Sequence, residues 1–368
     1  MNTARIRVKF LAKAQESGNY YGFWLRQFPN RVPSWGNCDF VFEQDCHDYD
    51  WLVVYDDFPK SDGERFPLWT EQLPCPQDNT LLVTYEPSTI KNYGRGFVNQ
   101  FGWVLSSQEP WAIKHPRVIA SQTGYIWLYG STDDRGSYDS LRRQSPPTKP
   151  FPISTVCSAK QMRHTVHHLR YQFTQRLKAA LPELEVFGHG VRAIPDKADA
   201  LDPFRLHLAV ENHLCRHHWT EKLSDSFLGF CLPIYHGCPN AADYFPEESF
   251  IPIAIGDFDE AFERITRALR DDEYTQRLPA IIEARRRILD HYALFPLLAR
   301  LIEERHQIRG EVPLAPHTIR SRRAIRHHDP LIGLTDGIDK TVLKVRHWLA
   351  RRAEVPSGVK PNDNLKLS

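Results

Sequence analysis

Two short polar motifs flank a His-rich loop in the middle of the chain. Glu211 and Asn212 end an apolar run, and Thr220, Glu221 and Lys222 open the segment that follows the loop. An ammonium group beside the free N–H groups of a helix start suits a phosphate or a diphosphate. A carboxylate in the same place would repel a phosphate, but it can hold the hydroxyl groups of a ribose. The local chemistry therefore favours a nucleotide diphosphate.

The same residues also fit an ordinary helix start. Thr220 is a good N-cap, Glu221 lies in the first turn, where a negative charge is favourable, and Lys222 can stay solvated. Spacing alone does not choose between helix capping and a ligand site.

The flanking segments predict a parallel α/β unit. Phe204–Val210 is predicted to be a strand, Thr220 to about Phe230 a helix, and Cys231–Tyr235 a second strand that stops at Gly237. A strand, a crossover helix and another strand form a βαβ unit of a parallel sheet. Ligands of such sheets bind beyond the carboxyl ends of the strands, which is where both motifs fall.

The region resembles glycosyltransferase family 10, the α-1,3/4-fucosyltransferases. That family carries, in order, Glu-Asn at a strand end, Thr-Glu-Lys, Pro-x-Tyr-x-Gly, Ser-Phe-Ile and Asp-Phe. The chain has these motifs at Glu211-Asn212, Thr220-Glu221-Lys222, Pro233–Gly237, Ser249–Ile251 and Asp257-Phe258. Several spaced motifs in one order are far more specific than one short pattern. The resemblance is clear over residues 153–268 and weaker over residues 81–107.

The resemblance implies an inverting enzyme that moves fucose from GDP-fucose to a hydroxyl group of a glycan acceptor, with no cofactor. It also implies the GT-B architecture, in which two Rossmann-like α/β domains face a central cleft, here followed by a helical C-terminal tail. We expect an acceptor-binding domain over residues 1–145 and a Pro-rich linker over residues 146–152. A donor domain over residues 153–309 and a basic amphipathic tail over residues 310–368 complete the prediction.

Glu86 is the predicted catalytic base. It follows the predicted strand Thr80–Thr84, at the end where a parallel strand presents side chains to a cleft, and Pro87 restricts it to an extended or turn conformation. A carboxylate there can take a proton from the acceptor, although most loop glutamates are simply solvated. In the family, a glutamate in a comparable place, often followed by a small residue and proline, is the base.

The resemblance assigns a second cation to the diphosphate. Arg192 follows Gly188-His189-Gly190, which is similar to the family's Tyr-Gly-x-Gly turn, with Phe187 in place of the tyrosine. We expect Arg192 and Lys222 to neutralise the charge on the leaving diphosphate, whereas an arginine on a surface loop is the ordinary alternative. Lys160 is a weaker candidate for the same role.

Four further residues are expected at the donor. Glu221 would hold the ribose hydroxyls, Asn212 would help to fix the donor, and Glu211 would orient the sugar or brace the loop. The family usually has a tyrosine three residues before the glutamate of Thr-Glu-Lys, where this chain has His218. That departure leaves the identity of the donor sugar or base open.

The density of histidine and cysteine raises the question of a metal. Two pairs have the His-x-x-x-His spacing: His213/His217 falls in a predicted loop, and His164/His168, at helical spacing, has no evident third ligand. Of two Asp-x-Asp motifs, the one at Asp257 opens a helix, where an N-cap is the simpler interpretation. We therefore expect no metal.

Composition excludes several function classes. A formal net charge of +2 gives no reason to expect nucleic-acid binding, and an apolar content of 41% supports folded cores. The seven cysteines show no pattern, which suggests reduced thiols in a cytoplasmic protein. The chain starts without a long apolar run, whereas animal members of the family have a Golgi membrane anchor, so we expect a bacterial, cytoplasmic enzyme. Residues 339–352 predict a basic amphipathic helix, with Ile338, Val342, Val345 and Leu349 on one face, that suits an anionic membrane surface or packing on its own protein.

Two rival functions stay open. One is a transferase of the same fold that uses a different nucleotide sugar, which His218 allows. The other is a catalytically degenerate protein that binds a nucleotide sugar without turnover. Hydrolysis of the donor in the absence of acceptor separates an enzyme from a binding protein.

Overall fold

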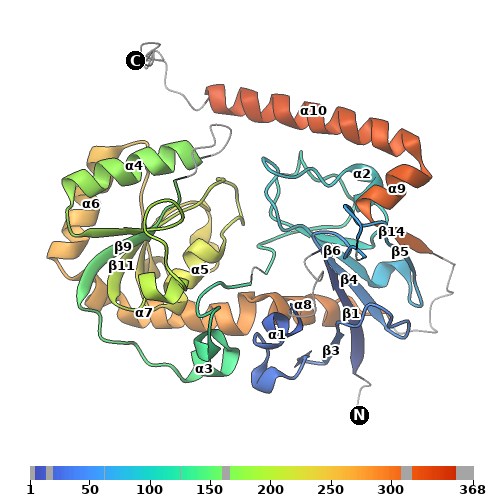
Figure 1. Cartoon of the computed structure of the whole chain (residues 1–368), viewed down its shortest axis with the longest axis horizontal. Coiled ribbons are helices and arrows are strands. Elements are labelled where there is room, and N and C mark those ends of the chain that lie inside the picture. The colour runs from blue at the N-terminus through green and yellow to red at the C-terminus, as the bar shows by residue number, and fades with distance from the viewer. Residues whose placement is uncertain are drawn as a thin grey trace.

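The structure is a computed structural model that describes residues 5–13, 20–61, 63–124, 126–159, 166–307 and 317–353. It forms two α/β domains, each built on a mainly parallel sheet. Figure 1 shows the two sheets in separate halves of the molecule, with the helix α10 (Pro330–Ala353) along the upper side. Two parallel-sheet domains followed by a C-terminal helix confirm the architecture that the sequence predicts.

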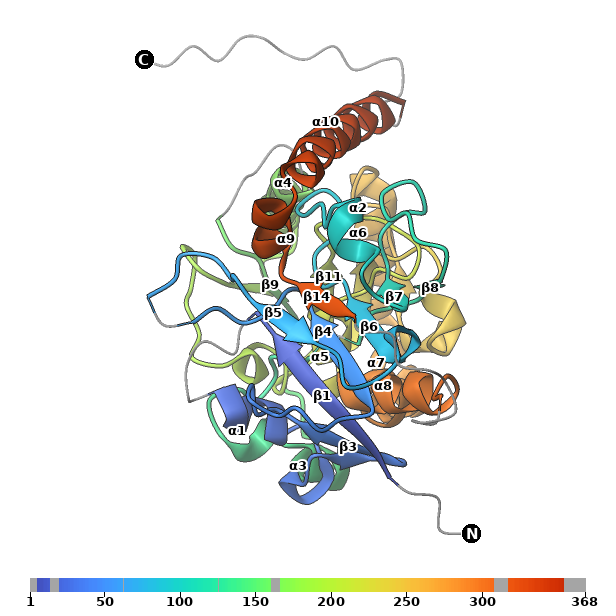
Figure 2. The same cartoon turned by 90° about the vertical axis from the view of Figure 1, so that its right-hand side faces the viewer.

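The first sheet has seven strands in the order β2-β3-β1-β4-β6-β7-β8, side by side in Figure 2. Its strands run parallel, except that β2 is antiparallel to β3. The central strands β4 and β6 are buried along their whole length, as strands with both faces covered must be. The strands are β1 (Ile6–Ala12), β2 (Ser34–Trp35), β3 (Cys38–Val41), β4 (Trp51–Tyr55), β6 (Thr80–Val83), β7 (Trp103–Ser106) and β8 (Val118–Ala120).

The second sheet has five parallel strands in the order β10-β9-β11-β12-β13. The βαβ unit predicted from the sequence is its centre, because β11, α5 and β12 follow one another there. The elements of this part of the chain are β9 (Phe151–Val156), α4 (His167–Ala180), β10 (Leu184–Phe187), β11 (Phe204–Val210), α5 (Glu221–Leu228), β12 (Leu232–His236), β13 (Ile251–Pro252), α6 (Phe258–Arg270) and α7 (Glu273–Arg287).

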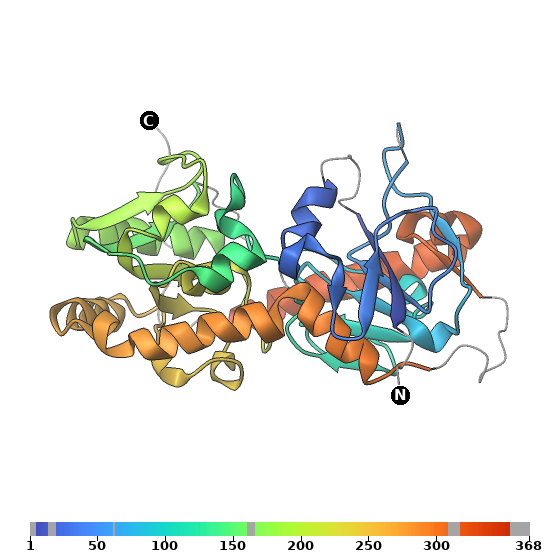
Figure 3. The ribbon, with the colours of Figure 1, turned by 90° about the horizontal axis from the view of Figure 1, so that it is seen from below.

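The chain exchanges segments between the two cores. Trp127 and Leu141 precede the second sheet in sequence but lie in its core. Phe295, in α8 (Leu294–Glu303), follows the second sheet but lies in the core of the first, with its ring centroid 4.1 Å from that of Phe28. Figure 3 shows the orange helices α7 and α8 running from one domain to the other. The predicted ranges 1–145 and 153–309 thus each contain residues that pack in the other domain, which ties the two domains together.

The C-terminal segment returns to the first domain. Strand β14 (Thr318–Arg320) pairs antiparallel with β5 (Thr70–Gln72), and Ile319 is buried in the core. The helices of this part of the molecule are α1 (Tyr20–Leu25), α2 (Arg95–Val98) and α9 (Arg322–His328), whereas α3 (Tyr138–Arg143) carries Leu141 into the second core. The predicted tail therefore begins with residues that belong to the fold of the first domain.

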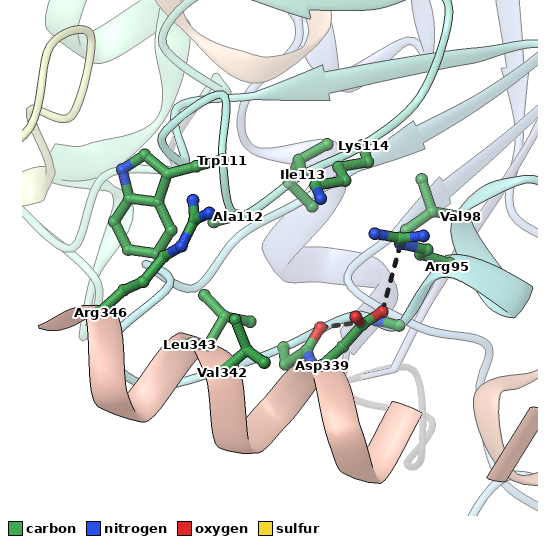
Figure 4. A pocket seen from close by; sticks show the side chains of 12 residues that line it. Arg95, Val98, Trp111, Ala112, Ile113, Lys114, Asp339, Val342, Leu343 and Arg346 are labelled. Atoms are coloured by element: carbon green, nitrogen blue, oxygen red, sulfur yellow. Dashed lines mark hydrogen bonds and ion pairs between the residues drawn. The ribbon is translucent and has the colours of Figure 1, made fainter. Parts of the chain in front are cut away.

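Helix α10 packs one face on the first domain. Leu343 is buried, and Asp339 forms an ion pair with Arg95 of α2 at 3.3 Å. Figure 4 shows the pocket between this face of α10 and the residues from Asn92 to Lys114, where the Arg346 guanidinium lies 5.7 Å from the ring centroid of Trp111. The amphipathic helix predicted at residues 339–352 lies within α10.

A second face of α10 is apolar and exposed. Ile338, Val342, Val345 and Leu349, predicted to share one face, all have large exposed fractions in the structure. Leu334 extends the same stripe by one turn. Among the described residues, no helix combines the length and the apolar character needed to cross a membrane.

Candidate active site

The carboxyl end of β11 is built around the buried carboxylate of Glu211. Both of its oxygens accept hydrogen bonds from Thr220, Oε1 from the backbone N–H at 2.8 Å and Oε2 from the hydroxyl at 2.7 Å. Lys222 Nζ lies 3.6 Å from Oε2. Burial raises the pKa of Glu211, and Lys222 opposes that rise. Glu211 therefore braces the loop that starts α5.

Thr220, Glu221 and Lys222 form both a capped helix start and a charged cluster at the cavity. Thr220 caps α5, because its hydroxyl accepts from the backbone N–H of Lys222 at 3.3 Å. Lys222 also pairs with Glu221, with Nζ 3.0 Å from Oε1. Burial acts to lower the pKa of Lys222, but the carboxylates of Glu221 and Glu211 outweigh it and raise that pKa. The helix start therefore carries a firmly charged ammonium group.

A cavity of about 260 Å³ lies beside this helix start, at the carboxyl ends of β9 and β11. Ligands of parallel sheets bind at such a place. Asn212 Oδ1 is buried there and has no hydrogen-bond partner among the described residues. A buried polar atom without a partner costs free energy unless a water or a ligand completes it. The lining includes Arg170, Lys197, Asn212, Glu221, Lys222 and Asp225.

Arg170 and Lys197 are cavity residues that the sequence did not single out. Arg170 is buried in α4, and its Nε has no hydrogen-bond partner among the described residues. Lys197 Nζ pairs with Asp225 Oδ2 at 2.9 Å and lies 3.9 Å from Glu221 Oε1. Lys222 and Lys197 together hold the pKa of Glu221 below its usual range, although burial opposes them.

A signal for Arg170 was available in the sequence. Phe173 and Leu177 are three and seven residues further on, so all three share one face of a helix. The structure buries these three residues on α4, whereas Leu169 is 57% exposed. A basic residue in register with a buried face indicates a site, because burying a charge requires a partner.

Glu86 lies across from this site, at the carboxyl end of β6 in the first domain. Its backbone N–H and that of Tyr85 donate to the hydroxyl of Tyr93, which donates in turn to Asp56 Oδ1 at 2.6 Å. Gln108 Nε2 donates to the Glu86 carbonyl at 2.7 Å. These bonds fix the backbone and leave the half-buried side chain to the space between the domains.

Burial raises the pKa of Glu86, and the nearby Asp56 carboxylate adds to the rise. The carboxylate of Glu221 in the second domain contributes in the same direction, so the two carboxylates lie near enough to interact across the domain boundary. A glutamate with a raised pKa is a more effective general base near neutral pH than an ordinary one.

The loop between β11 and α5 docks on the first domain. His218 Nδ1 lies 3.0 Å from Ser107 Oγ, and His213 Nε2 lies 3.1 Å from Glu109 Oε1. His218 is almost fully buried, and burial, with His213 and Lys222 nearby, lowers its pKa to about 3. It is not among the residues that line the cavity. Its position at the domain contact indicates that it joins the two domains.

Two predicted phosphate-binding residues are not placed at the cavity. Arg192 is exposed and pairs with Glu185, with Nη1 2.9 Å from Oε2. The predicted glycine turn before it exists, because Gly188 and Gly190 both have positive φ, and a Cβ at Gly188 would lie 2.6 Å from the Cys157 carbonyl oxygen. Lys160 lies outside the described residues. The roles of both stay predictions.

Asp257 is the N-cap of α6, since its Oδ1 accepts from the backbone N–H of Glu260 at 3.1 Å. This confirms the simpler interpretation of its Asp-x-Asp motif.

The unfolding free energy should fall as the pH drops from about 6.5 toward 3. Burial lowers the pKa of His218 and of His207 to about 3, so the folded chain keeps both neutral where the unfolded chain binds protons. Each of these two histidines contributes at most about 1.4 kcal/mol per pH unit to the slope of the unfolding free energy. Urea denaturation from about pH 4 to pH 7 should give His218→Gln a shallower slope than the wild type. The control His328→Gln, at an exposed position of α9, should keep the wild-type slope; an equal slope in all three proteins would contradict the assignment.

The chain is similar to known proteins in sequence and in structure. Residues 148–275 match the family model described as glycosyltransferase family 10 (fucosyltransferase), C-terminal part. A crystal structure of an α1,3-fucosyltransferase is similar at 14% identity, covering 80% of this chain and 93% of that chain with a TM-score of 0.46. A crystal structure of an α1,3-fucosyltransferase with GDP-fucose is similar at 14% identity, covering 78% of this chain and 92% of that chain with a TM-score of 0.38. The pneumococcal O-GlcNAc transferase GtfA in complex with UDP and GlcNAc is similar at 13% identity, covering 69% of this chain and 56% of that chain with a TM-score of 0.37. Residues 148–275 thus match the C-terminal part of glycosyltransferase family 10, and the chain is a glycosyltransferase.

Proposed function

We propose that this glycosyltransferase moves fucose from GDP-fucose to a hydroxyl group of a glycan, with inversion at the anomeric carbon. The observation that carries the proposal is the cavity beside α5, which three cations line together with an amide oxygen that has no partner among the described residues, with a carboxylate of raised pKa across from them. The choice of fucose comes from the family model that matches this domain.

The cavity supplies the charge that a leaving diphosphate needs. Lys222 lies at a helix N-terminus, where backbone N–H groups and the helix dipole also favour an anion. Arg170 and Lys197 add two further cations, and Arg170 Nε is free among the described residues to donate to a phosphate oxygen. Fixed positive groups stabilise charge that develops in the transition state. These residues would neutralise the leaving GDP without a metal ion.

Two polar groups would position the donor. Asn212 Oδ1 can accept a hydrogen bond from a sugar or ribose hydroxyl, since no described residue satisfies it. The Glu221 carboxylate stays ionised beside Lys222 and Lys197 and can accept from ribose hydroxyls. Arg192 would take its predicted part only by exchanging Glu185 for the diphosphate when the donor binds.

Glu86 would act as the base on the acceptor side. Inversion requires one group to take the proton of the attacking hydroxyl while the nucleotide leaves from the opposite face of the sugar. Glu86 belongs to the first domain and the cation cluster to the second, so the two roles fall on opposite sides of the space between the domains. A pocket is lined by residues 88–90, which follow Glu86 closely in the sequence, and by Lys344, His347 and Trp348 of α10. This pocket would receive the acceptor.

Calorimetry should find GDP-fucose bound more tightly than GDP-mannose or UDP-sugars. Arg170→Gln and Lys222→Gln should each weaken binding by roughly 10- to 100-fold, because each removes a charge-assisted hydrogen bond to a phosphate. Arg170→Gln is the cleaner variant, since it breaks no ion pair with Glu211 or Glu221. Lys178→Gln, also on α4 but outside the cavity, is the matched control. A folded wild type that binds no nucleotide sugar would sink the proposal, and preference for another one would keep the architecture but change the donor.

Glu86→Gln should lower kcat by about 10²- to 10⁴-fold while leaving GDP-fucose binding intact. The wild-type rate should fall as the pH drops through the pKa of Glu86, because a base works only when ionised, and that pKa is raised by burial and by Asp56. The variant should lack this acid limb, whereas Glu64→Gln, on another loop of the same domain, should keep it. A wild type that neither transfers fucose nor slowly hydrolyses the donor would instead be a binding protein.

We further propose that α10 lies on an anionic membrane surface. Its exposed stripe of Leu334, Ile338 and Leu349 runs between Lys344 on one side and Arg346 on the other, by helix geometry. An apolar face flanked by basic residues is typical of helices that lie in a membrane interface.

The chain should sediment with vesicles that contain an anionic lipid, more weakly at high salt, and not with neutral vesicles. The double variant Ile338→Gln, Leu349→Gln should lose this binding, because it removes two apolar side chains from the stripe. Leu214→Gln, at an exposed apolar position of the second domain, should bind as the wild type does. Equal sedimentation of both variants would contradict a role for α10.

A further inference from the structure

Three potential metal ligands meet where the two domains touch. Glu109 comes from the first domain, and His213 and Cys215 come from the loop before α5 in the second. One ligand atom from each lies within 4.8 Å of the others, and His213 Nε2 is 3.1 Å from Glu109 Oε1. His213 is buried, and the other two are partly buried. None of them takes part in the transfer reaction proposed above.

Neighbouring hydroxyl groups hold two of these ligands from behind. His213 Nδ1 lies 3.4 Å from Thr89 Oγ1, which leaves Nε2 toward the cluster. Ser88 Oγ donates to Glu109 Oε2 at 2.5 Å, which leaves Oε1 toward the cluster. Ser88 in turn contacts His347 Nε2 of α10 at 3.0 Å. Metal-binding histidines and carboxylates in proteins are commonly fixed in this way, through the atom that does not face the ion.

We propose that Glu109, His213 and Cys215 bind a divalent transition-metal ion, with zinc as the best fit, and that the ion fastens the two domains together. Imidazole nitrogen, thiolate sulfur and carboxylate oxygen are the three ligand types of zinc sites, and a water molecule would complete a tetrahedron. Magnesium and calcium prefer oxygen ligands alone, so this set of donors disfavours both.

The position of the ion gives it a structural role. Ser107, two residues before Glu109, contacts His218 of the same loop, and Gln108 between them donates to the carbonyl of Glu86. The segment 107–109 thus touches the second domain on one side and the proposed base on the other. An ion at Glu109 would hold this segment against the loop that leads into α5, and thereby fix the distance between base and donor site.

The first test is metal binding by the purified full-length chain, with zinc as the probe. Chelator-treated protein, returned to zinc and freed of excess, should hold about one zinc ion per chain. Cys215→Ser and His213→Gln should each lose most of it. His217→Gln, in the same loop but hydrogen-bonded to Tyr244, should hold as much as the wild type. A wild type that takes up no zinc, or variants that retain it fully, would overturn the proposal.

The second test identifies the sulfur ligand and stays valid where a variant folds poorly. Cobalt(II) added to the wild type should give a thiolate-to-metal charge-transfer band and the intense visible bands of a four-coordinate ion. The thiolate band should persist in Cys46→Ser, which changes a partly exposed thiol outside the cluster. Zinc should also raise the melting temperature of the wild type, because binding to the folded state stabilises it. Cobalt spectra without the thiolate band would contradict a site that includes Cys215, whatever the transferase assays show.

Discussion

The donor side of the molecule depends on one buried carboxylate. Glu211 has no exposure to solvent and accepts two hydrogen bonds from Thr220, while Lys222 balances its charge. A buried carboxylate without these partners would cost several kcal/mol. The loop after β11 must therefore turn back so that Thr220 meets Glu211, and this fixes where α5 begins. The position of the ammonium group at the cavity follows from that constraint.

Charge compensation extends from this carboxylate to the rest of the site. Lys222 and Lys197 share Glu221, and Lys197 also balances Asp225, so both lysines have opposite charges as neighbours. With Glu211, the network keeps two cations and three carboxylates close together beside the cavity, and Arg170 adds a third cation to its lining. Only Arg170 Nε and Asn212 Oδ1 remain unmatched among the described residues lining it. A ligand with both phosphate acceptors and hydroxyl donors completes both.

The exchange of segments between the cores gives the interdomain geometry its stability. Phe295 packs on Phe28 in the first core, and Trp127 lies in the second. Two domains joined by a single linker would move freely, whereas here each core contains side chains from the other part of the sequence. Contacts between the loop 212–219 and the segment 107–109 add polar bonds directly beside Glu86. Apolar packing and polar contacts thus together fix the position of Glu86 relative to the cavity beside α5.

The sequence by itself determined the local elements and the chemistry of the α5 start. Apolar runs predicted β11 and β12, and Thr220, Glu221 and Lys222 lie where their types indicate, because capping and first-turn charge are properties of neighbouring residues. Only the tertiary structure decided which distant side chains share the site. Arg170 and Lys197 are brought to the cavity from a helix and a 3-10 turn, Glu109 meets His213 from a loop of the first domain, and Arg192 is left at the surface. The reason is physical: a pattern along the chain reports periodicity and local hydrogen bonding, whereas the partner of a buried charge is chosen by how sheets and loops pack in three dimensions.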